Sequence, residues 1–345
     1  MSPIPNPKFK NPRAKYNFQG RTCSISGVGS YVPAKVLTNA DLEKMVDTSD
    51  EWIMTRTGIR ERRIAAKHEY TSDLGAQAAL RAMDRAGVTA DQIDLIIVAT
   101  ITPDMPFPAT ACIVQQKIGA RRAAAFDLEA ACSGFIYGLE VGQQFIMSRT
   151  YDTVLVIGAE KLSSITDWTD RNTCVLFGDG AGAAVLQSRP NSHGLLTAVM
   201  GADGSKGSLL HMPGGGSRCP ASADSVAARL HFLRMDGRET FKNAVQAMYE
   251  AAREALRRCE LDISKIKCVI PHQANRRIID AVGKRLGATP EQLFINLDRY
   301  GNTSAASVAI ALDEAVSSGI IQRGDLILMM VFGAGLTWGA AVIEW

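Results

Sequence analysis

An internal repeat constrains the fold of this chain more than any other feature. At residues 91–100 a short polar stretch leads into a continuous apolar run, and residues 264–271 have the same layout. Continuous apolar runs of this kind are typical of strands buried on both faces. Each run is followed by a helical pattern that stops at a glycine, Gly119 in the first copy and Gly287 in the second.

The parallel continues with a second helix and a second strand in each copy. The predicted elements are 133–147 and 153–157 in the first copy, then 304–316 and 326–331 in the second. Positions 133 and 304 are 171 residues apart, and positions 152 and 325 are 173 apart. A duplication explains this better than chance. It predicts an α/β fold of two similar layered halves, in which helices cover mostly buried strands.

The domain boundaries follow from the repeat. We predict an N-terminal half over 21–190 and a C-terminal half over 191–345, joined by a loop near 187–194. Residues 1–20 are Pro-rich and basic, and residues 1–40 contain no acidic residue. This pattern faintly resembles a transit peptide, but a flexible extension is the simpler interpretation.

Composition excludes several classes of protein. The chain has 345 residues, 46% hydrophobic and 21% charged, with a net charge of +3, which is ordinary for a globular protein and does not single out nucleic acid as a partner. No apolar run approaches the ~20 residues of a membrane span. The seven cysteines are scattered without a Cys-x-x-Cys pair, so we expect no metal site and no disulfide framework, and a cytoplasmic location.

Three short stretches each place one reactive side chain among small or polar residues. They carry Cys132 (130–134), His272 (271–275) and Asn302 (300–304). A thiol, an imidazole and a carboxamide can form an acyl-thioester and then react it with a carbanion. The repeat puts Cys132 and Asn302 at matching helix starts and His272 after a strand, so we expect them to face one cleft.

Each of these residues also has a plainer interpretation. Cys132 at a helix N-terminus is expected to favour a thiolate, but a buried structural cysteine is commoner. His272 alone reads as a satisfied histidine and Asn302 alone as a helix cap. Only their conjunction favours a catalytic site. The other histidines lack metal-like spacing: His68, His193, His211 and His231.

Two Gly-rich stretches lack the features of nucleotide-binding loops. Residues 177–183 have neither the Lys-Ser/Thr of a phosphate loop nor a dinucleotide fingerprint, and we predict a tight turn before a strand over 184–187. Residues 332–339 follow a strand of the second half. There, Gly333 could bring a bare N–H close to Cys132.

Six motifs in order resemble the β-ketoacyl-acyl-carrier-protein synthase III family of thiolase-fold condensing enzymes, from about Gly27 to Trp345. They are 39–52, 56–62, 130–134, 177–182, 271–275 and 301–307. The resemblance implies that Cys132 takes an acetyl group from acetyl-CoA, a substrate, with no cofactor. It also implies an oxyanion hole from the N–H groups of Cys132 and Gly333, and His272 and Asn302 as the groups that hold malonyl-acyl-carrier-protein during decarboxylation.

Binding residues are implied by the same resemblance. Those for coenzyme A are Thr48, Trp52, Arg56, Arg171 and Asn275. Those for the acyl carrier protein are Lys242, Gln273, Ala274, Asn275, Arg276, Arg277, Lys284 and Arg285. A homodimer is implied too, with Phe107 entering the partner's acyl pocket, where its bulk suggests a short starter.

The sequence departs from the family pattern in two places. The segment 213–229 is longer than usual, and 333–336 reads Gly-Ala-Gly-Leu where Gly-Gly-Gly-Phe is common, which leaves the starter preference open. Alternatives are a Cys-His-Asn hydrolase, a condensing enzyme of secondary metabolism, and a non-catalytic scaffold, against which the intact Cys132 speaks.

Overall fold

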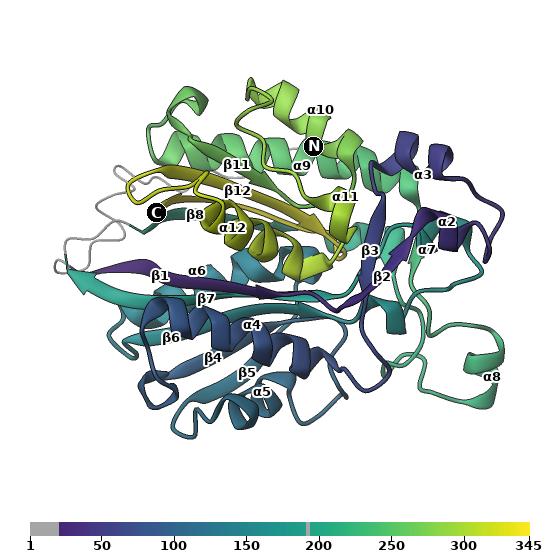
Figure 1. The fold of residues 1–345 in the computed structure, drawn as a ribbon, viewed down its shortest axis with the longest axis horizontal. Helices are drawn as coiled ribbons and strands as arrows, with labels where there is room; N and C mark the ends of the chain where they lie inside the picture. Colours follow the sequence, from purple (N-terminus) through teal and green to yellow (C-terminus); the bar gives the residue numbers. More distant parts are fainter. Residues whose placement is uncertain (1–20, 191–193) are drawn as a thin grey trace.

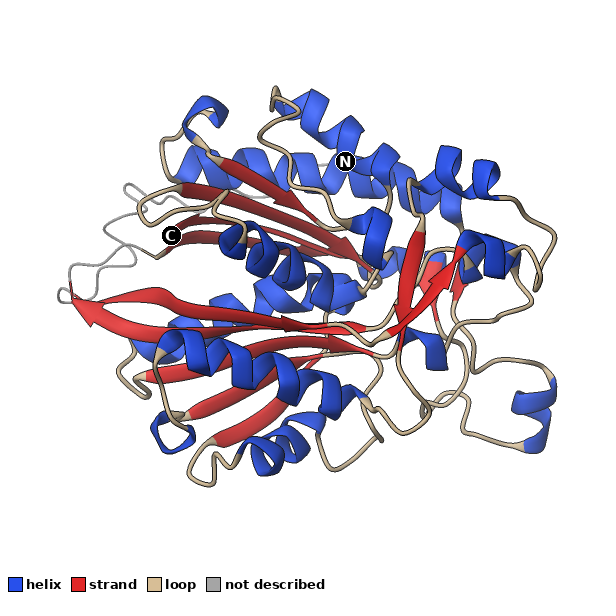
Figure 2. Ribbon diagram, in the orientation of Figure 1, coloured by secondary structure: helices blue, strands red, loops and turns tan. Residues whose placement is uncertain are grey.

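Two mixed sheets organise the computed structural model, which describes residues 21–190 and 194–345. The larger sheet has five strands in the order β1 (Arg21–Tyr31), β7 (Gly180–Pro190), β6 (Thr153–Glu160), β4 (Leu95–Ala99) and β5 (Ala124–Leu128). The smaller has four, in the order β11 (Cys268–Pro271), β12 (Leu326–Gly333), β13 (Thr337–Glu344) and β8 (Leu195–Ala202). Figure 2 shows them as two stacked groups of strands.

Helices fill the layers between and outside the sheets. Two central helices, α6 (Gly134–Met147) and α12 (Ser307–Ser317), bury their apolar side chains between the sheets in one core. The outer face of the larger sheet is covered by α4 (Thr71–Ala86) and α5 (Thr110–Ile118), and that of the smaller by α9 (Gly237–Arg258) and α10 (Arg276–Leu286). Figure 1 shows the resulting α-β-α-β-α layers, which confirm the predicted fold class.

The duplication is visible in strand order and direction. Strands β4 and β6 are parallel, β6 and β7 antiparallel, and β7 and β1 antiparallel. The same relations join β11 to β12, β12 to β13, and β13 to β8. Each half therefore contains the same four-strand unit.

The structure corrects the register of the repeat. Strands β4 and β11, strands β6 and β12, and helices α6 and α12 all begin 173 residues apart. The expected pairing of Ser133 with Ser304 is therefore off by two residues. Cys132 corresponds to Ala305, and Asn302 corresponds to Glu129, so the two site residues do not occupy equivalent positions.

A second correction concerns the Gly-rich stretch 177–183. Strand β7 already begins at Gly180, so the expected turn into a strand starting at residue 184 is wrong. Glycine is needed there for packing rather than for a turn. A methyl group at Gly182 would come within 2.5 Å of the Cβ of Ala309 on α12, a separation that real carbon atoms do not adopt.

The halves differ at their edges. Strand β5 pairs with β4 in the larger sheet, whereas the matching place beside β11 holds only an isolated bridge between Val269 and Leu293. The larger sheet therefore ends in a real strand, and the smaller sheet does not.

Short elements form a lobe at one end of the molecule, on the right in Figure 1. They are β2 (Lys35–Thr38), α2 (Asn39–Leu42), α3 (Asp50–Thr57), β3 (Glu61–Ile64), α7 (Arg171–Cys174), β9 (Leu210–His211), α8 (Ala223–Ala227), β10 (Arg234–Met235) and α11 (Leu297–Tyr300). Short 3-10 turns complete the chain: η1 (Ala90–Gln92), η2 (Ala131–Ser133), η3 (Leu162–Ser164), η4 (Gly204–Leu209), η5 (Ile263–Lys265) and η6 (Ser304–Ala306). Within the described ranges, no helix has the length and apolarity to cross a bilayer. The N-terminal extension 1–20 and His193 lie outside the described residues.

Candidate active site

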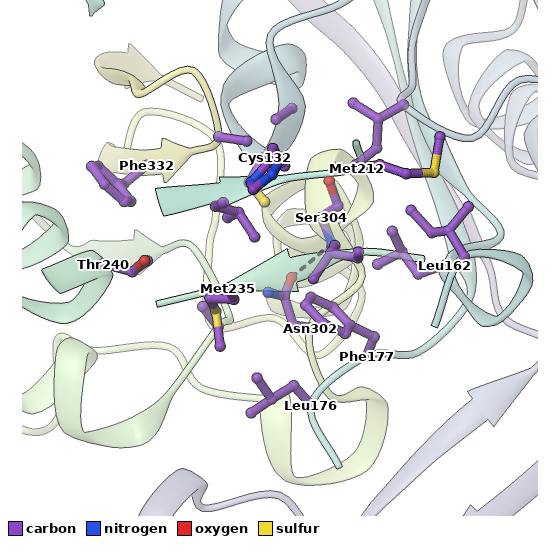
Figure 3. A pocket seen from close by; sticks show the side chains of 18 of the residues that line it. Cys132, Leu162, Leu176, Phe177, Met212, Met235, Thr240, Asn302, Ser304 and Phe332 are labelled. Atoms are coloured by element: carbon purple, nitrogen blue, oxygen red, sulfur yellow. Dashed lines mark hydrogen bonds between the residues drawn. The ribbon is translucent and has the colours of Figure 1, made fainter. Parts of the chain in front are cut away.

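One cavity of about 1690 Å³ brings the three candidate residues together. Cys132 of the first half and His272 and Asn302 of the second half all line it. Figure 3 shows the side chains of Cys132, Asn302 and Ser304 around this cavity, which all three line. The prediction that the duplication builds a shared cleft from widely separated segments agrees with this arrangement.

Cys132 lies on η2, the 3-10 turn that leads into α6. The residue before it, Ala131, has φ +46°, and the matching residue of the other half, Ser304, has φ +48°. Left-handed backbone is uncommon for residues other than glycine, and it recurs at functional turns. The two halves therefore use the same tight turn to enter their central helices.

Burial dominates the acidity of the Cys132 thiol. The side chain is only 6% exposed, and loss of solvent raises its pKa to about 12, against a smaller lowering effect of the Ser304 hydroxyl. Burial therefore opposes the thiolate that the helix N-terminus is expected to favour, and the backbone N–H of Cys132, which lowers the pKa, does not offset it. The thiol proton must leave as the sulfur reacts.

Gly333 brings the end of β12 against the cysteine turn. A methyl group at this position would lie 2.6 Å from the backbone nitrogen of Cys132, so only glycine permits the approach. The neighbouring Thr337 hydroxyl donates to the carbonyl of Ala130 at 2.9 Å, which ties β13 to the same turn. The backbones of Cys132 and Gly333 are thus held close together.

His272 is neutral and fixed. Its backbone N–H donates to the carbonyl of Met330, and its Nδ1 lies 2.6 Å from the Ser307 hydroxyl. Burial lowers its pKa to about 3. When Ser307 donates to Nδ1, the proton of the neutral ring sits on Nε2 and is available as a donor.

Asn302 has a fixed amide orientation. Its Oδ1 accepts the backbone N–H of Ser304 at 2.8 Å, drawn as a dashed line in Figure 3. Its backbone N–H donates to the carbonyl of Leu176, and its carbonyl accepts from Gly178. Because Oδ1 is occupied from the protein side, the amide presents Nδ2, a donor, to the cavity.

Two supporting residues were not predicted from the sequence. Ser307 orients the His272 ring, and Glu160, at the end of β6, is a fully buried carboxyl behind the cavity wall. Correct alignment of the repeat could have drawn attention to Glu160, because it occupies the position that matches Gly333.

The residues expected to bind CoA lie partly at the mouth of the cavity. Trp52, Arg56 and Asn275 line it, whereas Thr48 and Arg171 do not. Arg171 still lies over the Trp52 ring, 5.0 Å from its centroid, and Arg56 lies 5.2 Å from the same centroid. The Thr48 hydroxyl is buried without a hydrogen-bond partner.

The expected carrier-protein residues fall into three groups. Lys242, Arg277 and Ala274 line the cavity mouth, while Arg276 at the start of α10 and Lys284 and Arg285 in its last turn are exposed. Asn275 caps α10 by accepting from Arg277, and its Nδ2 donates to the carbonyl of Arg56.

Gln273 needs a correction. It is buried, its amide nitrogen donates to the carbonyls of Pro271 and Phe294, and its oxygen accepts from Asn296 and Leu297. Its side chain anchors this segment and is not exposed to a carrier protein.

Two further predicted features lie on the surface or near the mouth. Phe107 is 85% exposed. The long segment 213–229 carries α8, and Gly214, Gly215 and Gly216 from its start line the cavity. Among the residues that the structure describes, no group of three or more His, Cys, Asp or Glu side chains is arranged to hold a metal ion.

The duplicated layers and the shared Cys-His-Asn cavity define a condensing enzyme of the thiolase fold. The family model described as 3-oxoacyl-[acyl-carrier-protein] synthase III matches residues 126–204, and its C-terminal companion matches 256–345. The β-ketoacyl-[acyl-carrier-protein] synthase III of Caldanaerobacter subterraneus subsp. tengcongensis is 59% identical, over 93% of this chain and 97% of that protein. The chain therefore belongs to the β-ketoacyl-acyl-carrier-protein synthase III family.

Solved structures agree with the fold. The 3-oxoacyl-[acyl-carrier-protein] synthase III of Aquifex aeolicus VF5 is 50% identical with a TM-score of 0.87, over 94% of this chain and 100% of that one. The priming β-ketosynthase from the R1128 polyketide biosynthetic pathway is 37% identical with a TM-score of 0.86, over 98% of both chains.

Proposed function

We propose that this chain catalyses the initiating condensation of fatty acid synthesis. It transfers an acetyl group from acetyl-CoA to Cys132 and condenses it with malonyl-acyl-carrier-protein, giving acetoacetyl-acyl-carrier-protein, CoA and carbon dioxide. The observation that carries the proposal is the single cavity, in which the Cys132 thiol meets two neutral side chains, His272 and Asn302. Cytoplasmic location and catalysis without a cofactor stay predictions of the sequence.

In the first step the Cys132 sulfur attacks the thioester carbonyl of acetyl-CoA. The carbonyl oxygen gains negative charge, and the N–H groups of Cys132 and Gly333 stabilise it. The close approach of these two backbones supports this role. The tetrahedral intermediate then collapses, the CoA sulfur leaves with a proton, and acetyl-Cys132 remains.

In the second step malonyl-acyl-carrier-protein loses carbon dioxide. The C–C bond electrons move into an enolate, whose oxygen accepts from His272 Nε2 and Asn302 Nδ2. Two neutral donors stabilise this charge without a competing anion. The enolate carbon attacks the acetyl carbonyl, and the Cys132 sulfur leaves as a thiolate, which takes up one proton from solvent to regenerate the enzyme.

Substrate binding uses the cavity mouth. The adenine of CoA binds between the Trp52 ring and the Arg171 guanidinium. In the structure these two groups already stack on each other, with the guanidinium carbon 5.0 Å from the ring centroid, so no third flat group fits between them as they stand. Admitting a ring requires Arg171 to move, which breaks its 2.8 Å hydrogen bond to the carbonyl of Asp47. The Arg56 guanidinium binds a phosphate group of CoA. An acidic carrier protein docks on a rim that includes Lys242 and Arg277.

A homodimer is part of the proposal. Strand β5 is one of the two outer strands of the larger sheet, with β1 at the other edge, and an edge strand is suited to pairing with a second copy. The exposed Phe107 lies on the loop that precedes α5. In the dimer it would enter the partner's acyl pocket and limit the starter to a short acyl group such as acetyl.

A second candidate is a priming condensation in polyketide biosynthesis. The 37% identity to a polyketide priming ketosynthase over 98% of both chains favours its consideration. The same triad serves both reactions, so the acyl group accepted by Cys132 distinguishes them.

The test is an acyl-CoA panel (acetyl, butyryl, isobutyryl and hexanoyl) followed by mass measurement of the Cys132 peptide. We expect acetyl to load fastest and Cys132→Ala to load nothing. Preferential loading of a longer acyl group would favour the polyketide alternative. If Cys132 is never acylated, the proposed function fails.

A further inference from the structure

Glu160 is an ionisable residue close to the nucleophile. The proposed reaction does not use it. It ends β6 and is fully buried. Its carboxyl accepts hydrogen bonds from Thr102 Oγ1 at 2.6 Å, Thr100 Oγ1 at 3.1 Å and the Ile101 N–H at 3.2 Å. Thr100 and Ile101 line the cavity, so the carboxyl sits directly behind its wall.

Ser304 connects this carboxyl to the nucleophile. Its hydroxyl is buried and makes no hydrogen bond of standard geometry. The turn that carries it packs tightly between β6 and the start of α6: a methyl group at Gly158 would lie 2.5 Å from the Ala305 carbonyl oxygen, and one at Gly134 would lie 3.6 Å from the Ala305 Cβ. The hydroxyl also lowers the pKa of both Cys132 and Glu160. Figure 3 shows the Ser304 side chain beside Cys132. An unpartnered buried hydroxyl is costly unless it has a use.

We propose that Glu160 is a positioning residue that holds the proton of Cys132 during acyl transfer, acting through the hydroxyl of Ser304. This inference rests on the proposed function for its substrate. As the Cys132 sulfur bonds to the thioester carbon, its proton passes to Ser304 Oγ, and the Ser304 proton passes to Glu160. When the intermediate collapses, the Ser304 hydroxyl gives its proton to the departing CoA sulfur and takes the proton held by Glu160, which is again ionised.

The electrostatics suit this exchange. Burial raises the pKa of Glu160 to about 7, with the hydrogen bonds from Thr102, Ile101 and Thr100 and the nearby Ser304 hydroxyl opposing the shift. The group can therefore be a carboxylate before the reaction and an acid during it near neutral pH. Because proton transfer accompanies S–C bond formation, the thiol need not ionise first at its pKa of about 12.

Other ionisable groups around Glu160 have their own partners. Lys161 donates to the carbonyls of Ala66 and Glu69, Asp104 accepts from Ser72, and Asp179 accepts from Ser163 and Ala65. His272, across the cavity, is neutral because burial lowers its pKa to about 3. The Cys132 thiol is the titratable group that shares the Ser304 hydroxyl with Glu160.

The experiment measures the rate at which iodoacetamide alkylates Cys132 between pH 5.5 and 9.5, followed on the Cys132 peptide by mass spectrometry. Alkylation forms the S–C bond, expels iodide and releases the thiol proton, so it reports the proton path without any acyl substrate. The wild-type rate should rise with pH through about 7, the pKa of Glu160. The wild-type rate should level off above that pH, because Glu160 is then fully ionised. In Ser304→Ala and Glu160→Gln the inflection near pH 7 should vanish, leaving a rate that follows only the thiolate fraction and rises across the whole range, and the rate at pH 8 should fall ~10²-fold.

Matched variants separate this role from a structural one. Ser304→Ala is structurally conservative, because Ala131 already adopts φ +46° in the equivalent turn. It therefore decides the question even if Glu160→Gln fails to fold. Glu160→Asp should keep the rise near neutral pH. Thr102→Val removes a hydrogen bond that lowers the pKa of Glu160, so it should move the rise to higher pH.

Two results would overturn the proton path, and a third would separate it from the proposed function. An unchanged pH profile in Ser304→Ala rules out the path. Faster alkylation in Glu160→Gln means that the carboxylate merely repels the thiolate, as its charge alone would do, and the proposal fails. If the expected alkylation profiles hold while wild-type Cys132 is never acylated by acyl-CoA, the proposed function fails and the proton path stands.

Discussion

The two turns that enter the central helices share a backbone and differ in chemistry. In the first half, Ala131-Cys132-Ser133 leads into α6 with Ala131 at φ +46°, and in the second, Ser304-Ala305-Ala306 leads into α12 with Ser304 at φ +48°. The first turn carries the nucleophile. The second carries alanine at that position and instead presents Asn302 and Ser304 to the cavity. Duplication thus supplied two copies of one scaffold, and each copy took a different part of the reaction.

The strands behind these turns differ in the same way. The last residues of β6 and β12 correspond, and they are Glu160 and Gly333. Gly333 lets β12 touch the nucleophile's backbone, whereas Glu160 places a carboxyl behind the opposite turn. We therefore expect that damage beside the first turn blocks acetylation of Cys132, and that damage beside the second turn blocks decarboxylation.

The largest effect is expected for Asn302→Asp, in the second half. An anion in place of the amide would repel the developing enolate, so malonyl decarboxylation should fall ~10³-fold while acetylation of Cys132 persists. Decarboxylation is measured as carbon dioxide release from malonyl-acyl-carrier-protein. Release at the wild-type rate would remove Asn302 from the proposed role.

Gly333→Ala should impair the other step, acetylation of Cys132, and spare malonyl decarboxylation. Its methyl group would push against the Cys132 nitrogen at 2.6 Å and displace the oxyanion donors, so acetylation of Cys132 should slow ~10²-fold. Gly204→Ala is the matched control, because a methyl group there meets nothing within 4 Å. Equal acetylation rates in both variants would show that the close approach is not needed.

A smaller effect is expected at the cavity mouth. Reversing charge in Lys242→Glu and Arg277→Glu should raise the KM for malonyl-acyl-carrier-protein ~10-fold at low salt, with little change for acetyl-CoA. Lys265→Glu, outside the cavity lining, is the control. An equal KM change for both substrates would argue against a carrier-protein rim.

The smallest effect is expected from acidification. The folded-state pKa of His272 is lowered from 6.5 to about 3, so the ring stays neutral and decarboxylation should vary less than about twofold between pH 5.5 and 8. The same pKa shift determines how folding stability depends on pH. The neutral buried ring favours folding above pH 6.5, and this contribution is lost as pH falls toward 3. A decarboxylation rate that falls along a titration near pH 6.5 would mean that His272 is solvated in the working enzyme.

The sequence predicted the layers and the shared cleft because buried strands and glycine-terminated helices carry strong local signals. It missed the register of the repeat by two residues, since Ser133 and Ser304 look alike while the backbone aligns Ala131 with Ser304. The start of β7 at Gly180 was missed because glycine usually signals a turn, whereas here it admits α12.

The candidate site was predictable in its reactive groups and less so in its surroundings. Motifs rich in small residues identified Cys132, His272 and Asn302 as candidates. Burial is a tertiary property, so the high pKa of Cys132 and the buried position of Gln273 could not be read from local patterns. Glu160 lies in no motif, and only the correct register of the repeat, which pairs it with Gly333, could have drawn attention to it from the sequence.

The most direct test of the central claim is product analysis with both substrates present. The protein is incubated with acetyl-CoA and malonyl-acyl-carrier-protein, and the mass of the carrier protein is measured together with released CoA. We expect acetoacetyl-acyl-carrier-protein and CoA in equal amounts, and neither with Cys132→Ala. Free acetate with unmodified malonyl-acyl-carrier-protein would mean that water replaces the carbanion and that the protein is a hydrolase.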